Sequence, residues 1–142
     1  MATLSAGTKV GIGDAATPEV FNNIPGLTTL STPESTTSSV DTTTIASVAK
    51  EYISGLPDNG SLSLEGFWDS GNTYHVALRT AHVAQTAANF LMVFSDSPAT
   101  KVLFTATPET FVITSEPDAA ITFSMGLKVS GALDWTTTST IT

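Results

Sequence analysis

The sequence has no cysteine and few basic residues. Its 142 residues hold 5 Lys and Arg against 13 Asp and Glu, a formal net charge of -8. Without cysteine, a disulfide framework, a thiolate nucleophile and a Cys metal site are all excluded. A nucleic-acid-binding protein gains affinity by neutralising phosphates with clustered Lys and Arg, and the basic residues here are scattered along the chain. We therefore expect no specific binding of nucleic acid.

Long apolar runs are also absent. No stretch approaches the roughly 20 apolar residues that a membrane-spanning helix needs. Residues 1–10 lack the cationic head and apolar core of a secretory signal. We therefore expect a soluble protein that is synthesised in a cytoplasm, and a length that suits a single domain over residues 1–142.

Serine and threonine dominate what is present, with roughly 40 residues between them, dispersed among the apolar residues. This mixture suits half-buried strand surfaces and favours a mainly β fold. Alternation of apolar and polar residues, bounded by Pro, Gly and Asn turns, predicts the strands. They are expected at residues 9–12, 27–31, 61–68, 89–95, 101–107, 110–115 and 120–130.

One helix is expected over residues 72–86. Apolar residues, among them Tyr74 and Leu78, recur there at helical spacing, and Asn72 is a candidate N-cap. We expect this helix to pack its apolar stripe against the sheet.

Three segments carry too little apolar periodicity to predict a packed element. Residues 1–20 are interpreted as an N-terminal arm, because Pro18 interrupts any helix there. Residues 32–58 are interpreted as a long mobile loop, a length that is usually functional or disordered. Residues 136–142 hold only Ile141 as an apolar anchor and are interpreted as a second arm that orders on assembly.

Patterns typical of enzymes or metal sites fail in their context. The glycine-rich run at residues 11–16 matches a dinucleotide-binding string, but Pro18 prevents the helix that such a site requires. His75 and His82 would share a helix face, but Arg79 lies between them and a cation opposes metal binding. The acidic pairs Glu65 with Asp69 and Glu116 with Asp118 are more typical of solvated charge. We expect no enzymatic activity and no cofactor or metal.

The order of several turn and strand signals resembles a known family. The run FNNIPGL begins at Phe21, DTTT begins at Asp41, KEYISGL begins at Lys50, and DNG at Asp58 leads into an alternating strand. In this order and spacing they resemble the tail tube (major tail) protein of phages with long, non-contractile tails. The resemblance covers about a third of the chain.

The resemblance implies an antiparallel β-sandwich with one flanking helix. It also implies self-assembly into hexameric rings that stack as the tail tube of a virion, assembled in the host cytoplasm. The inner sheets of a ring would close into one barrel, through which DNA passes without specific binding. The tape measure, tail terminator and tail tip proteins are the further partners that the resemblance implies.

Two sets of residues follow as expectations for this chain. Contact between rings is expected at Thr36, Thr37, Asp41, Lys50 and Tyr52. An acidic lumen, which would leave DNA unattached, is expected to be lined by Glu34, Glu65, Glu109, Glu116 and Asp118.

Two alternatives remain open at the level of sequence. A tail terminator or a capsid decoration protein would share the acidic, β-rich composition but would cap or decorate rather than polymerise. A carbohydrate-binding β-sandwich could use Trp68 and Trp135 as stacking platforms, although aromatic residues on strands are more often core or interface anchors.

Overall fold

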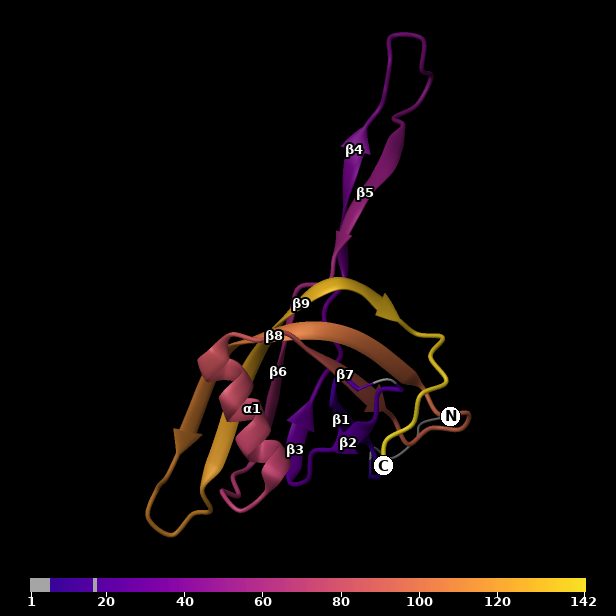
Figure 1. Cartoon of the computed structure of the whole chain (residues 1–142). Helices are drawn as coiled ribbons and strands as arrows, with labels where there is room; N and C mark the ends of the chain where they lie inside the picture. The colour runs from indigo at the N-terminus through magenta and orange to yellow at the C-terminus, as the bar shows by residue number, and fades with distance from the viewer. Residues whose placement is uncertain (1–5, 17) are drawn as a thin grey trace.

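A computed structural model describes residues 6–16 and 18–142. Within these residues the chain forms nine strands and one helix, arranged as Figure 1 shows. In chain order they are β1 (Lys9–Gly13), β2 (Phe21–Asn23), β3 (Leu27–Leu30), β4 (Thr36–Asp41), β5 (Tyr52–Asp58), β6 (Ser61–Phe67), α1 (Thr73–Ala84), β7 (Ala88–Val93), β8 (Lys101–Thr114) and β9 (Thr122–Asp134).

Seven of the strands form one antiparallel sheet in the order β2-β1-β7-β8-β9-β6-β3. The long β8 and β9 curve across the body in Figure 1. Strands β1 and β7 at one end of the sheet and β6 and β9 at the other contribute to one hydrophobic core. The sheet therefore folds back on itself in two layers, and the expected antiparallel sandwich with one flanking helix is confirmed.

The core follows directly from the period-two pattern of the strands. In β6, Leu62 and Leu64 are buried while the residues between them are exposed. Phe123, Met125 and Leu127 of β9 alternate in the same way. Such alternation places one face of the sheet on the core and leaves the other in water.

The helix lies over the core side of β8 and β9, and a buried histidine fixes its position. Asn72 caps its N-terminus by accepting hydrogen bonds from Tyr74 N and His75 N, as expected. His75 is 1% exposed; its Nδ1 accepts a hydrogen bond from Asp69 N at 3.1 Å, and its Nε2 lies 2.6 Å from the carbonyl of Pro25. These partners assign the proton to Nε2, because a carbonyl oxygen can only accept.

The expected N-terminal arm is wrong for residues 9–13. They form β1, which pairs with both β2 and β7, and Val10 is completely buried. The sequence predicts this short strand but not its place inside the sheet, because that place depends on distant β7. Residues 1–5 and 17 of the expected arm lie outside the described residues.

The expected free C-terminal arm also differs from the structure. Ile141 forms a parallel bridge with Phe21, and Thr142 N donates to the Phe21 carbonyl at 3.0 Å. The last residues thus extend the sheet edge at β2, where backbone hydrogen bonds stabilise a segment with little apolar surface.

The segment at residues 32–58 is not an irregular loop. It contains β4 and β5, which pair as a separate two-stranded hairpin that projects from the body at the top of Figure 1. The two strands expected at residues 101–107 and 110–115 are likewise one strand, β8, which continues through Pro108 because its register shifts there by a bulge.

No helix among the described residues is long and apolar enough to cross a membrane.

Candidate assembly surfaces

The projecting hairpin exposes almost its entire length. Every residue of β4 is exposed, as is every residue of β5 except Gly55. Val40 pairs with Ile53 across the two strands, and Leu56 is 91% exposed. A two-stranded hairpin with no third strand is at best marginally stable in water, so this arrangement suits a surface that becomes covered by another chain.

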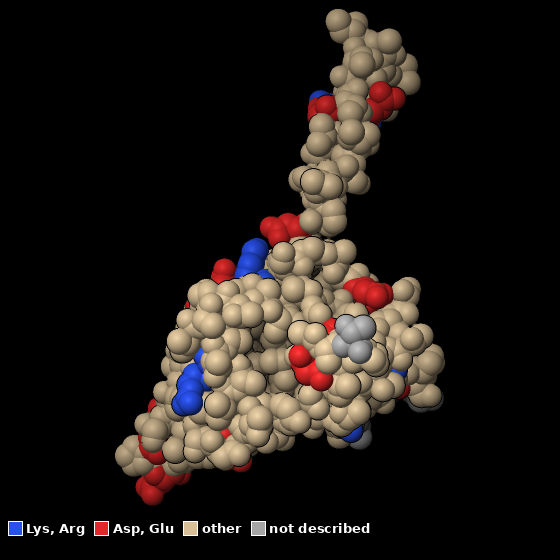
Figure 2. Space-filling view, in the orientation of Figure 1, with Lys and Arg blue, Asp and Glu red and all other residues tan. Residues whose placement is uncertain are grey.

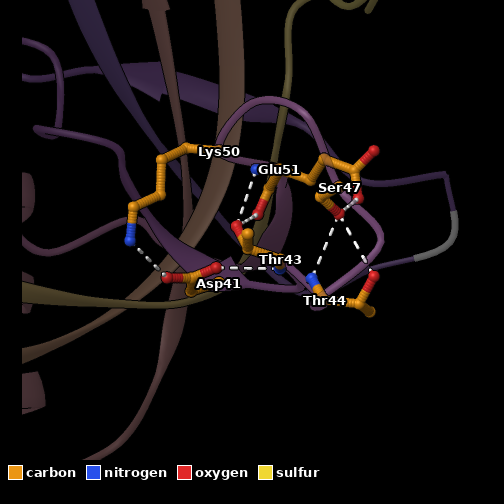
Figure 3. Close-up of polar contacts among 6 residues, drawn as sticks. All are labelled: Asp41, Thr43, Thr44, Ser47, Lys50 and Glu51. Carbon is orange, nitrogen blue, oxygen red and sulfur yellow. Dashed lines mark hydrogen bonds and ion pairs between the residues drawn. The ribbon is translucent and has the colours of Figure 1, made fainter.

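Hydrogen bonds hold the tip of the hairpin in a defined shape (Figure 3). Thr43 Oγ1 accepts from Glu51 N at 2.8 Å and donates to the Glu51 carbonyl. Ser47 Oγ donates to Glu51 Oε2 at 2.7 Å and accepts from Thr44 N at 3.1 Å. The tip, defined as residues 42–51, therefore has a folded conformation before any partner binds.

Asp41 closes the tip at the end of β4. Its Oδ1 accepts from Thr43 N at 2.9 Å, and its Oδ2 lies 3.8 Å from Lys50 Nζ. Hydrogen bonds from Thr43, with a smaller contribution from Lys50, lower the pKa of Asp41. Since both partners of the ion pair are largely exposed, it contributes little to stability.

The base of the hairpin is tied to the body by the turn at residues 58–60. Asp58 Oδ1 accepts from Gly60 N at 2.9 Å, and Asn59 Nδ2 donates to the Gly131 carbonyl at 2.5 Å. Gly60 has a φ of 62°, the left-handed region that glycine adopts without strain. Lys128 Nζ lies 3.6 Å from Asp58 Oδ1, and the Gly60 hydrogen bond, then the Lys128 charge, lower the pKa of Asp58.

A second exposed surface, the open face, is the side of β3, β6, β9 and the second half of β8 that points away from the core. The strand registers align its side chains in rows across the sheet. Its hydroxyl residues are Thr29, Ser61, Ser63, Thr107, Thr110, Thr114, Thr122 and Ser124. Glu65 and Lys128 are the charged members of these rows, and Phe67 and Val112 are the large apolar ones, 50% and 55% exposed. Hydroxyl residues outnumber both kinds.

The predicted site residues separate into these two surfaces. All five residues expected at contacts between rings, Thr36, Thr37, Asp41, Lys50 and Tyr52, lie on the hairpin or its tip. Of the five acidic residues expected in a lumen, Glu65 lies on the open face, and Glu109, at the bulge of β8, lies beside Ser61 and Ser63.

The other three acidic residues lie at the ends of the open face. Glu116 and Asp118 lie in the turn between β8 and β9, and Glu34 lies just before β4. The turn is at the lower left of Figure 1, away from the hairpin, and Figure 2 shows acidic side chains gathered there.

Sequence reasoning missed the apolar residues at the tip. Ile45 and Val48 are fully exposed, at 107% and 105% of their reference areas. Two branched apolar side chains within a run of Thr, Ser and Ala give no periodicity, so their isolation in a polar segment was the only available signal.

Four of the residues singled out for metal or carbohydrate binding, Trp68, His75, Arg79 and His82, serve packing, whereas Trp135 is 51% exposed. Trp68 stacks on His75 with ring centroids 5.8 Å apart, and Arg79 lies over the Trp68 ring at 5.8 Å. His82 stacks on Phe111. These rings hold α1 against the sheet, and the flanking side chains take up the Trp68 faces that a sugar would need.

Comparison with known proteins agrees with this architecture. The family model of the lambda-like phage tail tube matches residues 1–139. No curated protein shows a significant match to the chain.

Solved structures of tails share the fold. A chain of the virion of a native gene transfer agent superposes with a TM-score of 0.73 at 16% identity, covering 96% of this chain and 100% of its own. A chain of the tail of an empty particle of such an agent, refined with C6 symmetry, gives 0.69 at 19% identity, covering 90% and 96%. The SPP1 tail tube gives 0.68 at 16% identity, covering 92% and 77%.

The sandwich, its flanking helix and the match along almost the whole length lead to one assignment. The chain belongs to the lambda-like family of phage tail tube proteins, and it is a structural, tube-forming protein of the virion tail.

Proposed function

We propose that six copies of the chain form a ring whose open faces line a lumen, and that stacked rings form the tail tube. The observation that carries this proposal is a four-stranded region with two free edges. Within the described residues, β3 pairs only with β6, and the second half of β8 (residues 110–114) pairs only with β9. Free edges invite pairing with another chain, and ring closure removes them.

The geometry of such a ring suits the passage of a duplex. Four strands from each of six copies give about 24 strands, which at about 4.8 Å spacing and about 40° tilt close into a barrel about 48 Å across. The helix α1 lies on the core side of the same strands and would face outward. The six-fold symmetry of a related tail supports this number of copies.

The surface of the lumen would carry few charges that attract DNA. Lys128 is the one basic residue in the described rows of the open face, where Glu65 and the adjacent Glu109 oppose it. The acidic Glu34, Glu116 and Asp118 would add negative charge near the two ends of each ring. A hydroxyl-rich, weakly acidic wall with one lysine per copy has too few cations to hold phosphates by counterion release, so DNA would pass without attachment.

The hairpin would connect one ring to the next. It projects along one direction from the body, and its exposed length contains all five residues expected at contacts between rings, Thr36, Thr37, Asp41, Lys50 and Tyr52. A head-to-tail contact of this kind repeats without closing and generates a filament.

The remaining expectations belong to the same proposal. The chain would act without catalysis, cofactor or metal, and its further partners would be the tape measure, tail terminator and tail tip proteins. Its assembly would take place in the host cytoplasm.

Electron microscopy of the purified protein at rising concentration tests the proposal, with light scattering to follow the mass. Hollow tubes with a regular repeat are the expected result. Single closed rings that never stack would contradict tube formation and favour a terminator.

A further inference from the structure

Two apolar side chains lie at the far end of the hairpin with no contact to the body. Ile45 and Val48 are fully exposed on a tip that the hydrogen bonds of Thr43, Ser47 and Glu51 hold in shape. An exposed, prefolded apolar tip loses little conformational entropy when it is buried by a partner. It therefore has the character of an anchor.

A groove of matching chemistry lies on the body, where the two layers of the sheet leave the core open. It has a volume of about 290 Å³ and is lined by Leu27, Leu30 and Phe94, together with three threonines. This volume lies just below the range of about 300–1,000 Å³ typical of small-molecule sites, so the groove suits a few side chains rather than a larger ligand.

One threonine of the groove has no hydrogen-bond partner among the described residues. Thr8 Oγ1 is buried and unpaired within residues 6–16 and 18–142. Buried polar groups are normally paired, so within these residues the groove offers a hydroxyl as well as apolar side chains.

The groove and the tip lie at opposite ends of the molecule. The first residues of β3, which line the groove, lie in the lower part of Figure 1, whereas the hairpin projects from the top. The tip of a copy therefore cannot fill its own groove, but it can fill the groove of a copy stacked in the direction in which the hairpin projects.

Charge is complementary at the rim of the groove. Lys9 is exposed and directly follows Thr8, which lines the groove, whereas Lys101 Nζ donates to the Ser139 carbonyl at 3.0 Å and is engaged there. The hairpin carries Asp41 and Glu51 at its far end, with Lys50 offsetting one of them, and Figure 2 shows acidic side chains high on the hairpin. One basic residue thus lies beside the groove where the hairpin of another copy would arrive.

We propose that Ile45 and Val48 of one copy insert into the groove formed by Leu27, Leu30 and Phe94 of a second copy in the adjacent ring. The proposal rests on the tube-forming function above and names the residues that join its rings. Because each copy has one tip and one groove, the contact links copies into continuous strings along the tube.

Substitutions at the tip test the energetic role of this contact. A virus lacking its own gene for this chain is supplied with Ile45→Asp, Val48→Asp or the matched control Ala46→Asp, which adds the same charge to an exposed neighbour. We expect Ile45→Asp and Val48→Asp each to lower the yield of tailed, infectious particles by about tenfold or more, while Ala46→Asp stays within about twofold of the unchanged chain. Equal yields from all three variants would overturn the docking.

Cross-linking tests the pairing of the two ends directly. The chain has no cysteine, so Val48→Cys combined with Thr28→Cys, at the tip and in the groove, gives a single possible disulfide between docked copies. Oxidised tails should yield a ladder of covalent multimers, and each single variant should yield none.

The outcomes separate this inference from the function on which it rests. Assembled tails that give no ladder would overturn the docking while the tube function stands. If even the unchanged chain restores no tails to the virus, the proposed function is contradicted and the docking with it.

Discussion

At the scale of single residues, His75 is the buried polar side chain that connects the helix to the sheet. It bonds Asp69 N and the Pro25 carbonyl and lies 5.1 Å from the Phe123 ring, centroid to centroid. We predict that His75→Ala lowers the free energy of unfolding by about 3 kcal/mol, because two backbone groups lose their partner and a cavity forms. Urea denaturation measures this change.

The matched control is His82→Ala on the same helix. His82 stacks on Phe111, but its Nδ1 has no hydrogen-bond partner among the described residues. We expect a loss of only about 1 kcal/mol. Equal losses for the two variants would show that packing, rather than the hydrogen bonds of His75, carries the effect.

Aspartates in turns set the pH dependence of stability. Hydrogen bonds from the backbone N–H groups of Val20 and Ala16 lower the pKa of Asp14. Hydrogen bonds from Thr100 lower the pKa of Asp96. The pKa values of Asp41 and Asp58 are lowered as well. A carboxyl whose pKa is lower in the folded state stabilises the fold above its unfolded pKa of about 3.9, and this contribution is lost as the pH falls through the folded value.

We therefore predict that the contribution of these carboxylates to the free energy of unfolding stays constant from neutral pH down to about pH 5 and falls below that. The urea midpoint measured against pH gives the profile. Asp58→Asn keeps a side-chain oxygen that can accept from Gly60 N but removes the titration, so its decline should be shallower. A midpoint that stays constant down to pH 2 would contradict the role of these carboxylates.

The sequence predicts individual residues best where a period is visible. Leu62 and Leu64 alternate with Ser and Glu, and their burial follows from that alternation. The burial of His75 and the exposure of Ile45 could not be predicted, because each depends on which distant segment lies nearby.

At the scale of elements, the hairpin is the main difference between the expected and the observed fold. Its β4 strand, TTSSVD, shows no apolar alternation, and strand identity there comes from pairing with β5, such as Val40 with Ile53. The helix and β6 carry their own periodic signal and were predicted. Elements whose signal lies in the partner strand, β1 and the C-terminal residues included, were not placed correctly.

Removing the hairpin separates folding from assembly. Replacing residues 37–57 by Asn-Gly joins the paired Thr36 and Asp58 through a two-residue turn. We predict a body with a free energy of unfolding within about 1 kcal/mol of the full chain, because the hairpin lies outside the core. Electron microscopy should show no tubes.

The full chain under identical conditions is the control for assembly. Tubes of normal length from the shortened chain would show that the hairpin does not connect rings. Loss of the cooperative unfolding transition would show instead that the hairpin belongs to the folding unit.

At the scale of the whole molecule, the distribution of charge determines how DNA moves through the tube. We predict that the double variant Ser63→Lys and Ser124→Lys, on the open face, still assembles but slows DNA release, because added cations bind phosphates. High salt should restore the rate. Triggered DNA release from purified particles, measured at low and high salt, gives the comparison.

The matched control adds the same charge to the other side of the molecule. The double variant Thr80→Lys and Val83→Lys changes two exposed positions of α1. Particles built from this variant should release DNA at the unchanged rate. If both double variants slow release equally, the open face does not line the lumen.

The central claim is that copies of this chain stack as rings, with the open face inside and the hairpin reaching the next ring. Cryo-electron microscopy of tails that contain the chain tests it most directly. We predict six copies in each ring, β3 of one copy paired with residues 110–114 of β8 in its neighbour, and the hairpin tip on the adjacent ring. A map that places the chain in a single terminal ring, or turns α1 towards the lumen, would contradict the account.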